Sequence, residues 1–453
     1  MTEPGGHTTK SLPLRGGRPA LRRRSAPARL RGQLGELRRA KLPFLVLWVG
    51  FATVVACFGG GSFLGFQIAG LAWVVTLVLA LMILLRQAGS ISFPWWIWLP
   101  WATLVIVYYS LSHYESALQR SVMLLCPLVV GLAASTYRMA AEKVAGLHLL
   151  MRFITVALWG VVVLNTGLLV TGRLPATSGL APQAMTACLM ACYFVAEYAV
   201  GNRRALRWWG VLAVIPVIAL TRTAMVACAA TLPASFAKLK MTKRMLFGGL
   251  ILAAMLVVFY SPRVQHKMFR SGHGSIEDLS LDNPDLQTSG RTAIWDAMEA
   301  RIRLKPWFGY GANSSEAFVK SLTGGLTHPH NDWLRLRYDY GYVGTGIFAL
   351  CIVMQVLNLL ILASRARGDV RILLYAAASS FLPFVLIMFT DNIILYAAFF
   401  GNLQFALMGM GYAAMRGTRR AKRREGMART ATAGPVMVEG APRAAFRGTI
   451  EGK

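Results

Sequence analysis

The sequence has few charged side chains, and acidic ones are the scarcest. Only 15% of its 453 residues are Asp, Glu, Lys or Arg, while 55% are hydrophobic. An average soluble domain carries about 25% charged residues. The composition therefore excludes an ordinary water-soluble protein of this length. Apolar runs of about 17 to 23 residues predict transmembrane helices, because each must cross roughly 30 Å of hydrocarbon.

Cysteine is also scarce, and its placement excludes two common uses. All six cysteines lie inside apolar runs (Cys57, Cys126, Cys188, Cys192, Cys228 and Cys351). Neither a disulfide framework nor a zinc site is expected in lipid-facing helices. We interpret these side chains as small packing residues.

Positive charge, in contrast, is abundant. The chain carries 48 Lys and Arg against 19 Asp and Glu, a formal net charge of +29. In a soluble protein this excess would indicate nucleic acid. Here the basic residues gather in tails and short loops, where they orient membrane spans, so we expect no nucleic-acid partner. Attraction of the tails to anionic membrane lipids would explain their charge equally well.

Apolar segments recur along the chain and predict an all-α integral membrane protein with about twelve transmembrane helices. The segments are 44–58, 63–85, 93–111, 117–136, 144–170, 183–200, 208–220, 224–237, 245–260, 342–363, 371–389 and 393–415. The expected organisation is a basic disordered tail at 1–42, spans one to nine at 43–260, a polar loop at 261–341, spans ten to twelve at 342–415, and a second basic disordered tail at 416–453.

The distribution of basic residues predicts the orientation. Alternate loops are basic, at residues 86, 138–143, 203–207, 238–244 and 365–371, and so is the C-terminal tail. The opposite loops at 112–116, 172–182 and 390–392 carry little positive charge. Cytoplasmic loops are enriched in Lys and Arg. Both termini are therefore expected in the cytoplasm, and the long loop between spans nine and ten on the outer side.

Two arginines on that outer side are candidates for ligand binding. Arg222 lies between the seventh and eighth segments. An arginine so close to hydrocarbon costs several kcal/mol unless it is paired or hydrated, and a snorkelling interfacial residue is the alternative. Arg291 lies at the expected start of an amphipathic helix whose apolar stripe is Ile294, Trp295, Met298 and Ile302. A helix N-terminus suits a phosphate group, and a solvated surface arginine is the alternative.

His330 is the candidate catalytic residue. It follows His328 and Pro329 just before the tenth span. Histidine titrates near neutral pH and suits a general base. The two histidines could instead bind a metal, but no carboxylate or third histidine stands at a recognised spacing, and we predict no metal. A structural histidine that caps the next helix is the ordinary alternative.

Together these segments resemble a known family. His330-Asn331, nine further residues and Gly341-Tyr-Val-Gly344 are similar to the H-N-x9-G-x-x-G pattern of the O-antigen ligase and polymerase superfamily of bacterial membrane glycosyltransferases. The segments L-T-R-T-A-M-V-A at 220–227, S-G-R-T-A-I-W at 289–295 and P-W-F-G-Y-G at 306–311 also resemble that family. The resemblance covers roughly residues 208–389, and Thr221 stands where many members have serine.

The resemblance implies a C-type glycosyltransferase-like fold and an enzyme without metal or cofactor. Such enzymes transfer a glycan from undecaprenyl diphosphate to an acceptor hydroxyl, with inversion, at the periplasmic face of the bacterial inner membrane. It implies that Arg222 and Arg291 bind the diphosphate, for which guanidinium groups are suited. It also implies that His330 activates or orients the acceptor.

Supporting roles are expected for six further residues: Arg120, His328, Asn331, Asp332, Gly341 and Gly344. Asp332 either fixes a neighbouring imidazole or caps the helix that begins at Trp333. Arg120 either adds positive potential or has an interfacial role.

Two functional alternatives stay open. The enzyme is either a polymerase of O-antigen or exopolysaccharide repeats or a ligase that transfers a finished chain to lipid A–core, and a chain-length regulator could be a partner. H-P-H-N-D-W-L-R at 328–335 resembles the polymerase branch more. The second class is a secondary transporter or flippase, which twelve spans alone would suit. Few ionisable residues lie deep in the spans, however, and His148 and Arg152 are near the cytoplasmic end of the fifth.

Overall fold

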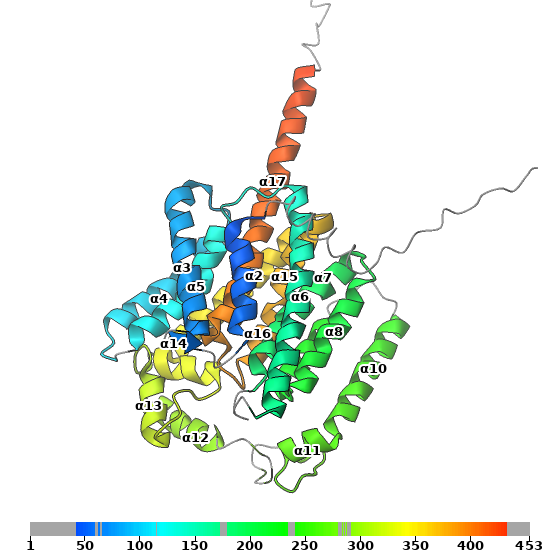
Figure 1. The fold of residues 1–453 in the computed structure, drawn as a ribbon. Helices are drawn as coiled ribbons and strands as arrows, with labels where there is room; N and C mark the ends of the chain where they lie inside the picture. The colour runs from blue at the N-terminus through cyan, green and yellow to red at the C-terminus, as the bar shows by residue number, and fades with distance from the viewer. Residues whose placement is uncertain are drawn as a thin grey trace, which may run out of the picture.

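The chain folds into a bundle of helices with helical lobes at one end (Figure 1). The computed structural model describes residues 42–58, 62–63, 66–114, 116–172, 179–233, 241–279, 283, 285, 287 and 291–432. Residues 1–41 of the predicted tail at 1–42, residues 433–453 of the second predicted tail, and Ser289 and Gly290 of the S-G-R-T segment lie outside these ranges.

The first half of the described chain contains nine helices and one very short hairpin. The helices are α2 Phe44–Ala56, α3 Ile68–Gln87, α4 Leu99–Ser110, α5 Ala117–Ala134, α6 Ala141–Val170, α7 Ala181–Val200, α8 Ala205–Ile218, α9 Arg222–Thr231 and α10 Met241–Phe259. Strand β1 (Ser62–Phe63) pairs antiparallel with β2 (Phe66–Gln67). Single 3-10 turns, η1 Ala88–Ser90 and η2 Trp95–Ile97, separate α3 from α4.

The second half contains the lobes and the remaining helices. They are α11 Pro262–Met268, α12 Arg291–Ile302, α13 Ser314–Thr323, α14 Asp332–Arg365, α15 Gly368–Ser379, α16 Phe381–Ile387 and α17 Asn402–Thr432. Between α16 and α17 lie the 3-10 turn η4 (Ile393–Leu395) and the π-helical η5 (Ala397–Gly401). Every one of the twelve predicted apolar segments contains a helix, so the all-α prediction is confirmed.

Six stretches in the described chain are long and apolar enough to cross a membrane: 69–90, 117–134, 142–170, 181–200, 332–365 and 368–387. Helices α10 and α11, bent by 70° at their junction, are a candidate seventh. Helices α2, α4 and α8 are apolar but shorter. These are the helices of a membrane protein, and the count of twelve spans stays a prediction.

Helix α7 forms the centre of the bundle. All its side chains from Gln183 to Glu197 are buried, and it packs against α8, α9 and α15. A helix that is apolar all round belongs in the core of a bundle. Around it, α5 and α17 approach closely at Gly131 and Gly409, where a side chain on Gly409 would overlap the Gly131 carbonyl. Small residues permit this close packing between membrane helices.

The end of the chain differs from the prediction. Residues 416–453 were expected to be disordered, but α17 continues to Thr432. Figure 1 shows this helix projecting from the bundle at the end opposite to α11, α12 and α13. Ala, Arg, Lys, Glu and Met dominate residues 416–432, and these are the strongest helix formers.

The polar segment forms a small lobe against the start of α14. In α12 the buried side chains are Ile294, Met298 and Ile302, which confirms the predicted apolar stripe. They pack with Val319 of α13 and with Leu334 and Tyr338 of α14. The lobe is therefore attached to the helix that begins immediately after His330.

Helix α14 is interrupted at Gly341, whose φ of 67° and ψ of −172° are not helical. In a continuous helix the amides of Tyr342 and Val343 would bond to the carbonyls of residues 338 and 339. Instead they donate to the carbonyls of Pro306 and Trp307, at 2.8 and 3.1 Å.

The two carbonyls freed by this break are also used. The amides of Tyr310 and Gly311 donate to the carbonyls of Tyr338 and Asp339, at 2.9 and 3.0 Å. The backbone of residues 306–311 thus replaces both missing helical hydrogen bonds. A side chain at Gly341 would overlap the backbone of residues 307–308. The two glycine-containing motifs, 306–311 and 341–344, therefore pack against each other where α14 is interrupted. We call this contact between residues 306–311 and α14, with its four backbone hydrogen bonds, the joint.

Candidate functional site

Three cationic side chains are grouped where α9, α11 and α12 meet the loops that precede or follow them. Arg222, the first residue of α9, donates from Nη2 to the Gln287 carbonyl at 3.2 Å. Arg291, the first residue of α12, donates from Nη1 to the Thr390 carbonyl at 2.9 Å. Lys267 in α11 donates from Nζ to the Leu220 carbonyl at 2.8 Å. Each cation is held by a backbone carbonyl.

These cations act on one another electrostatically. Burial lowers the pKa of Arg222, and the charge of Arg291 lowers it further. Burial also lowers the pKa of Lys267, with both arginines contributing. None of the three forms an ion pair with a carboxylate in the part of the chain that the structure describes. Like charges held together without a counter-ion favour a bound polyanion.

His330 is held by a carboxylate from a loop that is distant in the sequence. Its Nδ1 lies 3.3 Å from Oδ1 of Asp391, which also accepts from the Asn392 amide (2.8 Å) and the Tyr396 hydroxyl (2.9 Å). Burial alone would raise the pKa of Asp391, but the hydrogen bonds from His330, Asn392 and Tyr396 outweigh it and hold that pKa below its ordinary value. Asp391 is therefore ionised at neutral pH.

The ionised Asp391 determines which nitrogen of His330 is basic. The side-chain amide of Asn392 also lies 3.3 Å from Nδ1, but a negative charge favours a proton on Nδ1. The lone pair is then on Nε2, the nitrogen suited to accept a proton. His330 has a left-handed φ of 52°, and Trp295 Nε1 donates to the preceding Pro329 carbonyl at 2.7 Å. These contacts fix the position of the imidazole.

Residues Thr390 to Asn392, between α16 and η4, join the cations to the histidine. The Thr390 carbonyl accepts from Arg291, its hydroxyl is hydrogen-bonded to the Thr223 hydroxyl next to Arg222, and Asp391 holds His330. Arg291 and His330 thus contact this loop directly, and Arg222 is next to it through the neighbouring Thr223. The sequence interpretation missed Asp391 and Lys267. The only sequence signal for Asp391 is an acidic residue in a three-residue loop on the predicted outer side.

Asn331 and Asp332 have structural contacts. The Asn331 side chain caps α14 by accepting from the Leu334 amide at 3.0 Å. Asp332 neither caps that helix nor holds a histidine, contrary to both predicted roles. Its Oδ2 accepts from the Ile394 amide at 2.8 Å, and its Oδ1 lies 3.6 Å from Arg335 Nη1. Asp332 is the first residue of α14, one position after the cap, and its side chain contacts the η4 turn.

Arg120 and His328 form a second polar group beside the site. Arg120 donates from Nε to Glu316 Oε2 at 2.9 Å and lies 3.3 Å from His328 Nε2 through Nη2. Burial, followed by the charge of Arg120, lowers the pKa of His328 to about 4. His328 is therefore neutral at physiological pH. In the described ranges no three His, Cys, Asp or Glu side chains are grouped as metal ligands.

Gly341 and Gly344 serve packing. Gly341 allows the joint with residues 306–311, and a side chain on Gly344 would come within 2.9 Å of Leu104 in α4. These two glycines therefore permit the close packing that positions the first part of α14, the helix that follows His330.

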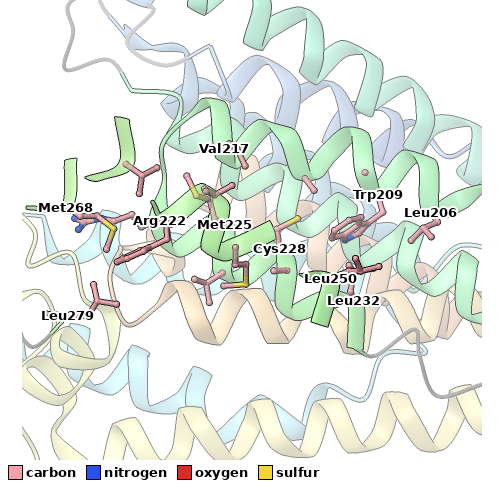
Figure 2. Close-up of a pocket in the computed structure, with 18 of the residues that line it drawn as sticks. Leu206, Trp209, Val217, Arg222, Met225, Cys228, Leu232, Leu250, Met268 and Leu279 are labelled. Atoms are coloured by element: carbon pink, nitrogen blue, oxygen red, sulfur yellow. The ribbon is translucent and has the colours of Figure 1, made fainter. Parts of the chain in front are cut away.

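An apolar cavity of about 620 Å³ lies between α8, α9, α10 and α11. Among the residues that the structure describes, its lining is almost wholly apolar, and Arg222 is the one charged side chain in it. Figure 2 shows Arg222 and Met268 at one end of this cavity and Leu206 and Trp209 at the other. The cavity therefore leads from the cationic group along the apolar surface of α8 and α9.

Residues 209–349 match the protein family described as O-antigen ligase. A comparison with curated proteins found no match. The matched stretch contains Arg222, Arg291 and His330, and it confirms the resemblance to the O-antigen ligase and polymerase superfamily there.

Proposed function

We propose, from the match of residues 209–349 to the O-antigen ligase family, that this membrane protein transfers a glycan from undecaprenyl diphosphate to an acceptor hydroxyl. One observation carries the proposal. Arg222 lies at the end of an apolar cavity beside Arg291 and Lys267, and none of the three pairs with a carboxylate among the described residues. The loop that holds Arg291 through Thr390 also holds His330 through the ionised Asp391.

The cations suit the donor. The diphosphate would bind Arg222, Arg291 and Lys267, and the first isoprene units would lie in the apolar cavity that starts at Arg222. When the bond between the sugar and the diphosphate breaks, negative charge develops on the leaving diphosphate. Positive groups already in place stabilise that charge without reorganisation. Arginine adds bidentate donation to phosphate oxygens.

His330 suits the acceptor. Its Nε2 would take the proton of the acceptor hydroxyl as that oxygen bonds to the anomeric carbon and the diphosphate leaves. The imidazolium that forms is stabilised by Asp391, whose negative charge faces Nδ1. Attack from the side opposite the leaving group inverts the sugar.

The proposal includes the predicted topology: twelve spans, cytoplasmic termini and a site on the periplasmic face of the inner membrane. The acceptor is a growing glycan or lipid A–core, and we favour a polymerase because of the 328–335 segment. A chain-length regulator would then be a natural partner.

Transfer by the purified protein from a synthetic polyprenyl-diphosphate glycan tests the assignment. His330→Ala should lower the rate by about 10²–10⁴-fold, the usual contribution of a general base. Arg291→Ala should weaken donor binding and slow transfer. Lys320→Ala, an exposed cation on α13, is the matched control and should keep the wild-type rate. A His330→Ala protein that inserts normally and transfers at the wild-type rate would exclude the mechanism.

Cell-surface glycan profiles after deletion of the gene distinguish the remaining versions. Single repeat units on the acceptor, without a ladder, indicate a polymerase. A bare acceptor with long polymer left on the carrier indicates a ligase. Loss of all carrier-linked glycan from the outer side would indicate a flippase.

A further inference from the structure

An exposed apolar patch lies in the polar segment, away from the cations and His330. Leu304, Trp307 and Phe308 follow α12, and their exposed fractions are 77%, 64% and 67%. Large apolar side chains grouped on a surface mark an interaction site. We call these three residues the 304–308 patch.

The backbone that carries the patch is held firmly. Residues 306 and 307 accept the Tyr342 and Val343 amides at the α14 joint, and the Phe308 carbonyl accepts the Tyr108 hydroxyl at 2.8 Å. These bonds leave the Trp307 and Phe308 side chains outside the lobe, where they have no core to enter. The exposure of the patch is therefore a consequence of the joint itself.

The patch continues a surface of a membrane span. The Trp307 ring lies 6.3 Å from that of Tyr342 in α14. Along α14 the exposed large apolar side chains are Tyr342, Val343, Leu350, Val353, Leu357, Leu360 and Ile361. Their spacing places most of them along one side of the helix. The tenth predicted apolar segment begins at residue 342 and belongs to the candidate membrane helix 332–365. In the proposed membrane orientation this side therefore faces lipid, and the patch lies beside the outer end of the apolar segment.

Basic residues flank the patch. Arg301, Arg303 and Lys305 are all exposed. The Arg301 guanidinium lies 5.1 Å, and the Lys305 ammonium 5.1 Å, from the ring centroid of Tyr310. Apolar and aromatic side chains beside Lys and Arg are typical of segments in the headgroup region of a bilayer, where anionic lipids attract the basic groups.

We propose that the 304–308 patch inserts into the headgroup–acyl boundary of the surrounding bilayer, with Arg303 and Lys305 at anionic headgroups. The lobe then has a second attachment besides α14. The depth of the joint, and with it the His330 turn, is fixed relative to the lipid surface. This inference concerns a lipid contact and does not depend on the transferase activity.

A fluorophore at position 308 tests the insertion. All six native cysteines are buried, so Phe308→Cys gives a selective labelling position. The labelled full-length protein is reconstituted in phosphatidylcholine–phosphatidylglycerol vesicles with a lipid that carries a nitroxide near its headgroup. Leu322→Cys on α13 is the matched control, since Leu322 is also an exposed apolar residue of the lobe. The label at 308 should be quenched at least about twofold more strongly than the label at 322.

Equal quenching at the two positions would overturn the proposal. So would a label at 308 that escapes the nitroxide lipid and instead crosslinks to a second copy, because the patch would then be a protein interface. The double variant Arg303→Gln/Lys305→Gln tests how much the two positive charges contribute to insertion of the patch. Quenching at 308 should then no longer increase when phosphatidylglycerol is added to phosphatidylcholine vesicles, whereas an unchanged increase would contradict the role of the basic residues.

Discussion

Gly341→Ala is the change to which the joint between α14 and residues 306–311 should be most sensitive. The φ and ψ of Gly341, 67° and −172°, belong to a region that only glycine adopts readily. A side chain there costs about 1–3 kcal/mol in backbone strain. It would also meet the Trp307 carbonyl, so residues 306–308 must move away. The amides of Tyr342 and Val343 would then lose their acceptors, at about 1 kcal/mol or more each.

The expected loss in the free energy of unfolding is therefore about 3–5 kcal/mol, the sum of that strain and the two hydrogen bonds. Thermal unfolding in detergent measures the total. Hydrogen exchange at the amides of residues 310, 311, 342 and 343 localises it, because all four should lose protection together.

Gly346→Ala is the matched control on the same helix. Gly346 has no neighbour within 4 Å of an added side chain, and alanine favours a helix over glycine by about 1 kcal/mol. This variant should be as stable as wild type or slightly more so. If Gly341→Ala and Gly346→Ala unfold at the same temperature and the four amides stay protected in Gly341→Ala, these four hydrogen bonds do not depend on Gly341 as described.

Three further changes test the site. Asn331→Ala should lower stability by about 1 kcal/mol through loss of the α14 cap, measured by thermal unfolding, whereas Asn331→Asp should largely retain it. Asp391→Asn should reduce turnover by about 10²–10⁴-fold with little change in donor KM, because the imidazolium loses its charged partner. Since the folded pKa of Asp391 is lowered, the stability that its own ionisation contributes is present above the ordinary carboxyl range and is lost as the pH falls below that range. Acid unfolding of wild type and of this variant measures that loss. The pKa of His328 is about 4 in the folded protein and 6.5 for an ordinary histidine. Between these two pH values the unfolded chain therefore binds a proton at His328 that the folded protein does not. Wild type should therefore lose stability relative to His328→Gln as the pH falls from about 6.5 to about 4.

Local patterns in the sequence were sufficient for the helices and for part of the site. Each apolar segment predicted a helix, because burying or lipid-exposing a continuous run satisfies its backbone only in helical form. The stripe of α12 followed from the 3.6-residue period, as Ile294, Met298 and Ile302 show. Local chemistry also selected Arg222, Arg291 and His330. In the structure the 390–392 loop contacts Arg291, His330 and Thr223, the neighbour of Arg222.

Contacts between distant segments were not predictable in this way. Asp391 lies 61 positions after His330, and no pattern in either segment points to the other. Lys267 is one basic residue among many until α11 brings it to Arg222 and Arg291. Asp332 was assigned to a cap by proximity in sequence, but the cap is Asn331, one residue earlier. The glycine motifs were recognised separately, and only the fold shows that they share four hydrogen bonds.

The loop from Thr390 to Asn392 has a consequence for which substrates can react. Thr390 holds Arg291 and the next residue, Asp391, holds His330. In the proposed mechanism Arg291 would face the departing diphosphate and His330 the incoming hydroxyl. Under that proposal, two adjacent loop residues would set the distance between the diphosphate site and the acceptor site. A donor and an acceptor whose reacting atoms did not match this distance would then react slowly, however well each bound. Inserting one residue into the loop should change which acceptors react more strongly than it changes the affinity for the lipid carrier.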